Sequence, residues 1–200
     1  MTEPTPPERG DDDAVDVLLM SKAARGDHDA FEELVTRHQH GVVGTVAKML
    51  GNASEAQDIA QQVFLRLWKS APRYKPTAKF TTYLYTITRN LVFNETRRKV
   101  RRKEHSLDEQ EEGWHQQLPE AAESQPDVQI LHSEMQLAVD RAIASLPEKQ
   151  RLAVVLRRYE QMPYEEIAQV LDLSVSAVKS QLFRARTALR ESLQQFLDAE

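Results

Sequence analysis

The apolar residues of this chain recur with the period of an α-helix over most of its length. A first amphipathic helix is predicted from Val15 to near Gly26, and Asp27 can cap a second helix that stops at Gly51. The apolar stripe of the second helix consists of Phe31, Leu34, Val35, Val42, Val46 and Met49. No stretch shows the alternation of a strand, so the sequence predicts an all-α protein.

A third helix is expected from Ser54 to about Lys69, because Ser54-Glu55-Ala56-Gln57 has the spacing of a capping box. One face of this helix carries Ala56, Ile59, Ala60, Val63 and Leu67. Its apolar surface extends beyond that face through Phe64, Leu65 and Trp68, beside the polar residues Asp58, Gln61 and Gln62. A stripe this broad needs more than one neighbour. The pattern fits a central core helix as well as a helix that is half core and half docking surface.

A basic and aromatic loop, 73–79, leads into a fourth helix that starts near Phe80 and runs into 97–103, where six of seven residues are cations. Rings beside cations, with amides and hydroxyls between them, suit single-stranded nucleic acid, because bases stack on rings and cations follow the backbone. For Phe80 and Tyr83 by themselves, the core is the better interpretation. The loop and the basic run together favour nucleic acid.

Residues 104–127 contain eight acids and no Lys or Arg, together with Pro119, Pro126 and Gly113. Such a segment repels itself and stays flexible, so it is predicted to be a linker between two domains. Trp114 within it either docks on a partner or is partly exposed. The predicted division is an acidic disordered tail at 1–13, a helical domain at 14–103, an acidic flexible linker at 104–130 and a second helical domain at 131–200.

The stretch 163–190 contains two helical patterns separated by a turn, and Ser174 can cap the second. The inner face of the second helix carries Val175, Val178, Leu182, Ala185 and Leu189, and its outer face carries Ser176, Lys179, Ser180, Phe183, Arg184 and Arg186. This pattern predicts a helix-turn-helix, whose hydroxyls and long cations reach base edges and phosphates in the major groove. An ordinary solvated hairpin would avoid exposing Phe183, so DNA binding is the stronger interpretation.

The net charge of −5 conceals an uneven distribution, with acids in the tail and linker and cations in 97–103 and 174–190. The chain has no cysteine, no apolar run of membrane-spanning length and no visible signal peptide, which predicts a cytoplasmic protein without membrane insertion. It also lacks a Gly-rich phosphate loop, a metal-ligand motif and a nucleophile with its base. We therefore expect no enzyme activity, no cofactor and no metal site.

Six motifs, in this order and spacing, resemble the extracytoplasmic-function (ECF) group of bacterial sigma factors. They are Gly26-Asp27 with Phe31-Glu32-Glu33-Leu34; residues 56–65; residues 80–85; Leu146-Pro147; residues 164–168; and Val178-Lys179-Ser180 with residues 183–186. The resemblance covers roughly residues 16–196. It implies an alternative sigma factor that binds core RNA polymerase, recognises the −35 and −10 promoter elements, and promotes DNA opening and transcription initiation.

The resemblance also implies roles for individual residues. In sigma region 2, the first domain, the residues expected to bind polymerase are Asp58, Gln61, Gln62, Phe64 and Leu65, and those expected to capture the −10 strand are Tyr74, Lys79, Phe80, Tyr83 and Asn90. In sigma region 4, the second domain, the −35 element is expected to meet Ser176, Lys179, Ser180, Phe183, Arg184 and Arg186. An anti-sigma factor is expected as a further partner. We also hypothesise that the two domains mask each other in the free protein.

Two alternatives belong to other classes. A conventional transcription regulator would share the helix-turn-helix but would not explain the aromatic and basic loop, and such regulators usually bind palindromes as dimers. A helical nucleic-acid enzyme or a structural scaffold is the second alternative. The missing catalytic constellation argues against the enzyme, and two basic faces separated by an acidic linker argue against the scaffold.

Overall fold

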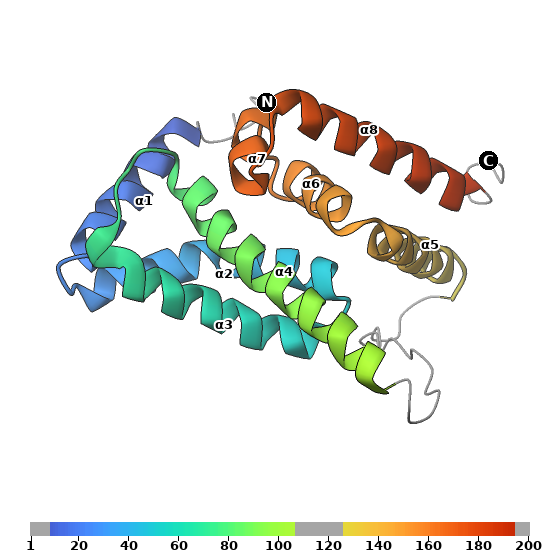
Figure 1. Ribbon diagram of the computed structural model, residues 1–200, viewed down its shortest axis with the longest axis horizontal. Coiled ribbons are helices and arrows are strands. Elements are labelled where there is room, and N and C mark those ends of the chain that lie inside the picture. The colour runs from blue at the N-terminus through green and yellow to red at the C-terminus, as the bar shows by residue number, and fades with distance from the viewer. Residues whose placement is uncertain (1–8, 107–125, 195–200) are drawn as a thin grey trace.

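The computed structural model describes residues 9–106 and 126–194, and within these ranges every regular element is a helix (Figure 1). The prediction of an all-α protein is confirmed. The elements are α1 (Arg9–Ala23), α2 (His28–Leu50), α3 (Ala53–Ser70), the short 3-10 helix η1 (Ala71–Arg73), α4 (Phe80–Ser106), α5 (Pro126–Ser145), α6 (Glu148–Arg158), α7 (Tyr164–Leu171) and α8 (Val175–Ser192). Trp114, whose role the sequence left open, lies outside the described residues.

Helices α1 to α4 form the first module, in which α2 packs against α1 and α3, and α3 packs against α4. The predicted apolar stripes meet inside it, and the residues with the least exposure include Leu34, Val42, Val46, Val63, Leu67, Phe80 and Leu84. Burial of such side chains removes apolar surface from water, which is the main favourable contribution to folding. The helical period of the sequence therefore identifies this core correctly.

The helix ends follow local chemistry, with one correction. Asp27 caps α2 as expected, since its carboxylate accepts a hydrogen bond from the Ala30 N–H at 3.0 Å. The cap of α3 is Asn52, not Ser54: its side-chain oxygen accepts hydrogen bonds from the backbone N–H groups of Ser54 at 3.0 Å and Glu55 at 3.2 Å. Asn is among the best N-cap residues, and its position two residues earlier gives α3 an additional half turn.

The first helix begins earlier than the sequence suggested. Helix α1 starts at Arg9, inside the segment 1–13 that was expected to be a tail. Asp12 pairs with Arg37 at 2.9 Å, and Asp13 accepts a hydrogen bond at 2.8 Å from the N–H of Phe80, the first residue of α4. The acids at 12–13 therefore hold α1 against the module because they meet a cation and a free helix N-terminus.

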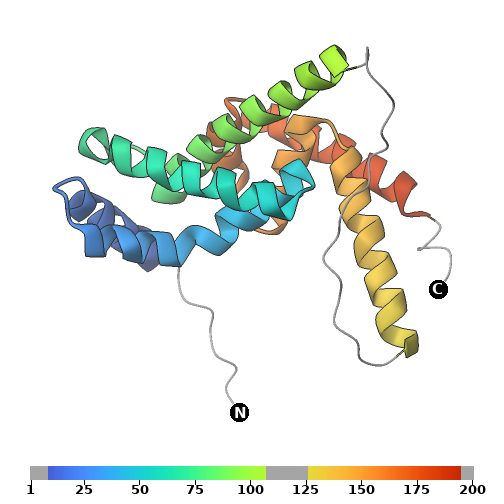
Figure 2. The same cartoon turned by 90° about the horizontal axis from the view of Figure 1, so that it is seen from below.

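Helices α5 to α8 form the second module. Helix α6 packs against α7 and α8, and their contact buries Leu152, Leu156, Ile167 and Val178. Helix α5 projects from the rest of the molecule, as Figure 2 shows. Met135 of α5 is exposed.

The two modules are packed directly on each other. Helix α7 lies against α4, and α5 and α6 lie against α2, so that buried residues of both modules belong to one apolar cluster. Polar contacts reinforce this packing: the guanidinium of Arg151 on α6 donates a hydrogen bond at 2.6 Å to the carbonyl of Met49 on α2, and Lys48 lies 3.5 Å from Asp140. This packing of α7 on α4, and of α5 and α6 on α2, is the kind of contact that the masking hypothesis requires.

Candidate nucleic-acid and polymerase interfaces

The helix-turn-helix is built from α7, a tight turn and α8. Asp172 ends α7 in the left-handed conformation, with φ of 54°, and its N–H donates back to the last turn of the helix. Asp tolerates this conformation better than most residues. Ser174 then caps α8, since its hydroxyl accepts a hydrogen bond from the Ala177 N–H at 3.2 Å. The inner residues Val178, Leu182 and Ala185 are buried, and this fixes which face of α8 points outward.

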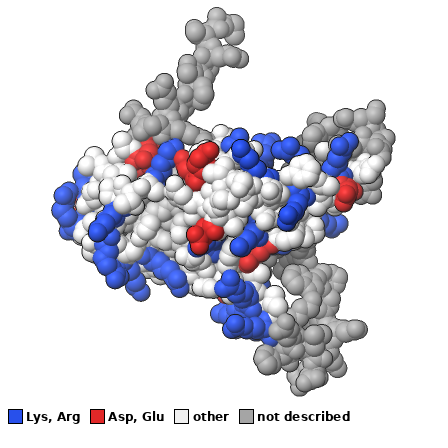
Figure 3. Space-filling model, turned by 45° about the horizontal axis from the view of Figure 1, so that its top comes forward, with Lys and Arg blue, Asp and Glu red and all other residues white. Residues whose placement is uncertain are grey.

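The structure brings all six residues expected at the −35 element onto the outward face of α8. Ser176, Lys179, Ser180, Phe183, Arg184 and Arg186 are all exposed. Phe183 is 70% exposed, more than any other large apolar residue reported for the described chain. Within the described ranges, none of the three cations of this face takes part in an ion pair. Cations predominate over acids on the face shown in Figure 3, although the net charge is −5.

The five residues expected at the −10 strand divide into exposed and buried members. Asn90 is exposed and Lys79 is 45% exposed at its side chain, so both are accessible to a nucleic acid. Tyr74 and Tyr83 are half-buried, with their rings 5.2 Å apart between centroids. Phe80 is fully buried in the core, where its ring contacts those of Tyr74 and His38. In this packing Phe80 supports the loop from inside and does not reach a base.

Tyr74 in the loop and Tyr83 on α4 pack against each other and are half-buried. The hydroxyl of Tyr83 donates a hydrogen bond at 2.7 Å to the Ser70 hydroxyl at the end of α3. Burial, helped by the negative charge of Asp13, raises the pKa of Tyr74 to about 12. A buried phenol resists ionisation because the charged form loses its hydration. Tyr74 is therefore a neutral ring at ordinary pH.

Four of the five residues expected to bind polymerase share the solvent-facing side of α3. Asp58, Gln61 and Gln62 are exposed, and Leu65 is 57% exposed. Phe64 is only 8% exposed and belongs to the core cluster. Most of the broad apolar stripe of α3 is therefore core, and Leu65 remains exposed on the same face as the polar Asp58, Gln61 and Gln62.

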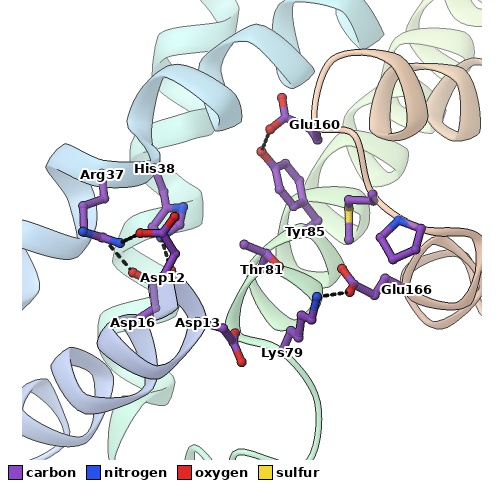
Figure 4. Close-up of a pocket in the computed structure, with 12 residues that line it drawn as sticks. Asp12, Asp13, Asp16, Arg37, His38, Lys79, Thr81, Tyr85, Glu160 and Glu166 are labelled. Atoms are coloured by element: carbon purple, nitrogen blue, oxygen red, sulfur yellow. Dashed lines mark hydrogen bonds and ion pairs between the residues drawn. The ribbon is translucent and has the colours of Figure 1, made fainter. Parts of the chain in front are cut away.

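Sequence reasoning missed a polar cluster that joins the modules. Glu160, in the turn between α6 and α7, accepts a hydrogen bond from the Tyr85 hydroxyl on α4 (Figure 4). It also accepts a hydrogen bond at 3.3 Å from the Thr45 hydroxyl on α2. Burial and the charge of Glu160 raise the pKa of Tyr85 well above its ordinary value. Gly41 lies beneath these groups, and a Cβ there would come within 2.6 Å of the Tyr85 hydroxyl and 2.8 Å of a Glu160 oxygen. We name Gly41, Thr45, Tyr85 and Glu160 the latch.

A second missed cluster surrounds the start of α6. The guanidinium of Arg151 donates to the carbonyls of Ala144 and Leu146 as well as to Met49. Desolvation by burial lowers the pKa of Arg151 and raises the pKa of Glu148. Arg151 therefore links the end of α2 to the α5–α6 connection. Neither cluster has a local sequence signal, because its members come from distant helices.

The described ranges contain neither a metal site nor a membrane-spanning helix. No group of three or more His, Cys, Asp and Glu side chains there is arranged to hold a metal ion. No helix there has the length and apolar character needed to cross a membrane.

Comparison with known families matches both modules. The family model described as sigma-70 region 2 matches residues 34–102, and the model described as sigma-70, region 4 matches residues 136–189. Two solved structures share the fold, at 23% and 21% identity: CnrH in complex with the cytosolic domain of CnrY, with a TM-score of 0.64 over 93% of this chain and 99% of that one, and the sigma factor RpoE in complex with the anti-sigma factor NepR from Bartonella quintana, with a TM-score of 0.65 over 82% and 96%.

Similar sequences extend over nearly the whole chain. The RNA polymerase sigma-H factor of Pseudomonas aeruginosa is 33% identical over 184 residues, which are 91% of this chain and 95% of that protein. The ECF RNA polymerase sigma-E factor of Escherichia coli K12 is 32% identical over 181 residues, 90% of this chain and 94% of that protein. Both sigma regions are matched, and these relatives are more than 30% identical over at least nine-tenths of the chain, so the chain belongs to the ECF group of RNA polymerase sigma factors.

Proposed function

We propose that this sigma factor divides promoter recognition between its two modules along the boundaries expected from sequence. Residues 14–103 bind core polymerase and the −10 element, residues 131–200 bind the −35 element, and 104–130 connect them. The outward face of α8 supports this proposal most strongly, because it exposes two hydroxyls, Phe183 and three cations that form no ion pair with a described residue. Each wrong base at the −35 site is expected to cost about 1–3 kcal/mol.

Opening of the −10 element needs the polymerase as well. Unpairing DNA costs about 1.4 kcal/mol per base-pair step, and one base stacked on a protein ring returns roughly 1–3 kcal/mol. The platform of Tyr74 and Tyr83, with Asn90 and Lys79 beside it, can thus hold open only a short stretch. Isolated protein is expected to bind promoters weakly, and the chain has no bond chemistry to perform.

The deciding experiment is transcription in vitro with purified core RNA polymerase and a library of random promoter fragments. Transcripts that depend on this protein and share a two-part motif support the proposal and define both elements. A shift of a palindromic duplex without polymerase, with no transcription, would point instead to a conventional regulator.

The role of α8 is tested by Lys179→Ala combined with Arg184→Ala. We expect loss of −35 recognition with polymerase binding unchanged, because both side chains lie on the exposed face of α8. A matched control removes two exposed cations from the same module but from other helices, Arg141→Ala with Arg158→Ala. Equal losses in the two double variants would mean that α8 contributes only general charge.

The role of α3 is tested by Leu65→Ala, since Leu65 is exposed whereas Phe64 supports the core. Loss of a central apolar contact typically costs more than 1 kcal/mol in an interface, so polymerase affinity should fall about tenfold. The exposed Lys69→Ala, one turn further along α3, is the control. Unchanged polymerase affinity in Leu65→Ala would contradict the assignment.

We further propose that the protein acts in the cytoplasm, where RNA polymerase works, and that an anti-sigma factor controls it. The shared fold of two proteins solved as complexes, one of them named as a complex with an anti-sigma factor, supports the second part. Co-purification of a partner that prevents polymerase binding would test it.

A further inference from the structure

Helix α7 and the turn after it carry only negative charge. Residues 164–172 contain Glu165, Glu166 and Asp172 and no Lys or Arg. In residues 174–190, by contrast, every charged residue is a Lys or an Arg. This acidic helix is the element that packs against α4. Of these acids, Glu166 faces the first module, whereas Glu165 and Asp172 are exposed, and the cations of α8 face solvent.

Glu166 lies directly on a residue proposed to bind the −10 strand. Its carboxylate is 2.7 Å from the ammonium of Lys79, just before α4 (Figure 4). The Glu166 side chain is 13% exposed and that of Lys79 is 45% exposed, so the acid is held in the interface while the cation remains partly accessible. Lys79 can bind either this carboxylate or a DNA phosphate with the same ammonium group.

Asp172, which ends α7, is a second acid near α4, but it is exposed and forms no ion pair with a described residue. It lines a cleft of about 470 Å³ together with Arg89, Asn90 and Arg97 of α4 and Arg66 of α3. Within residues 9–106 and 126–194, none of the three arginines has an ion-pair partner, and Arg89 donates to the Asn90 side-chain oxygen at 2.8 and 3.1 Å. Asn90 thus has its acceptor occupied, and a carboxylate from the other module stands beside the arginines.

We propose that α7 inhibits the first module by standing in for the DNA backbone, with Glu166 and Asp172 taking the places of phosphates along the α4 surface. The inference rests on the proposed assignment of the −10 strand to that surface. A strand and α7 cannot occupy α4 together, because both need Lys79 and the same side of the helix. Release of α7 is then a condition for capturing single-stranded DNA, and the closed protein has little affinity for it.

The test compares two charge reversals on adjacent residues, Glu166→Lys and Glu165→Lys. Both add the same charge to the first turn of α7, but Glu165 is exposed and has no ion pair with a described residue. Binding of a fluorescent pool of random single-stranded oligonucleotides is measured by anisotropy, and the separation of the modules by small-angle scattering. We expect Glu166→Lys to expand the protein and to bind the pool about fivefold more tightly than Glu165→Lys.

The outcomes separate a failure of the proposed inhibition from a failure of the −10 assignment. Equal radii and equal affinities in the two variants would overturn the inhibition. Expansion without tighter binding would retain the contact but overturn the −10 assignment on which it rests. Tighter binding without expansion would show an effect of charge alone and would also overturn the inhibition. Glu166→Gln against Glu165→Gln, followed by circular dichroism, repeats the comparison with little change of shape, in case Lys at position 166 prevents folding.

Discussion

Replacing Gly41 by Ala gives a test of the latch in which two effects oppose each other. Gly in the interior of a helix costs roughly 0.5–1 kcal/mol relative to Ala, so the change should by itself stabilise α2. Gly44, three residues further along α2, is a matched control because a Cβ there meets nothing within 4 Å. We expect Gly44→Ala to raise the free energy of unfolding by up to about 1 kcal/mol.

At Gly41 the added methyl group would collide with the latch. The nearest atoms are the Tyr85 hydroxyl at 2.6 Å and a Glu160 oxygen at 2.8 Å. Tyr85 is only 4% exposed and its ring cannot swing aside, so Glu160 must move and its hydrogen bonds must break. Hydrogen bonds to a charged group contribute about 1.5–3 kcal/mol, so a net cost of about 2 kcal/mol is reasonable after the gain in helix propensity.

The assay is urea unfolding of both single variants, alone and in a Glu160→Ala background. We expect Gly41→Ala to be less stable than Gly44→Ala by about 2–3 kcal/mol, and this gap to shrink by at least half when Glu160 is absent. Gly41→Ala matching Gly44→Ala in stability would refute the reasoning, because the latch would then yield without cost. A gap that persists in Glu160→Ala would assign the cost to Tyr85 alone.

Three further outcomes follow from single side chains. Asp16→Ala should lower the free energy of unfolding by about 2–3 kcal/mol, because it removes a buried carboxylate bonded to Arg37 at 2.8 Å and leaves that cation half-buried; urea unfolding measures this. Ser174→Ala should cost about 1 kcal/mol through loss of the α8 cap, visible as a lower thermal midpoint, whereas Ser174→Asp should retain most of the stability. The raised pKa of Tyr74, about 12 against 10.0 for the ordinary group, means that the folded state holds this proton more tightly than the unfolded state. The contribution of this raised pKa to the free energy of unfolding is complete below pH 10 and is lost as the pH rises towards 12. Tyr74→Phe should therefore make the loss of stability at alkaline pH smaller, as measured by denaturation at a series of fixed pH values.

Much of the fold was predictable because helical periodicity is a local signal. The stripes of α2, α3 and α8 identify the residues that are now buried, and the motif order identifies the two sigma regions. The outward face of α8 was equally predictable, since burial of Val178 and Leu182 leaves only one side for Lys179 and Arg184. Cap positions were less secure, because Asn52 and Ser54 compete within two residues for the same N–H groups.

The contacts between the modules were not predictable residue by residue. Tyr85 and Glu160 are 75 positions apart, and Thr45 and Glu160 are 115 apart, so no spacing rule relates them. Burial also redistributes roles that residue type alone suggests. The family resemblance implies docking and stacking roles for Phe64 and Phe80, but their rings fill the first core, whereas Leu65 and Phe183 remain outside.

The hydrogen bond from the Phe80 N–H to the Asp13 carboxylate affects both the folding of the newly synthesised chain and its sensitivity to proteolysis. The two residues are 67 positions apart, so the acceptor emerges from the ribosome well before the helix that it caps. The Asp13 carboxylate can therefore cap the first turn of α4 only after α4 has been synthesised and has formed. A protease that removes residues 1–13 would spare every core residue of the first module, yet it would fray the turn beside the Tyr74 and Tyr83 rings. Loss of this segment would thus disturb the proposed −10 surface before it disturbs the core of the first module.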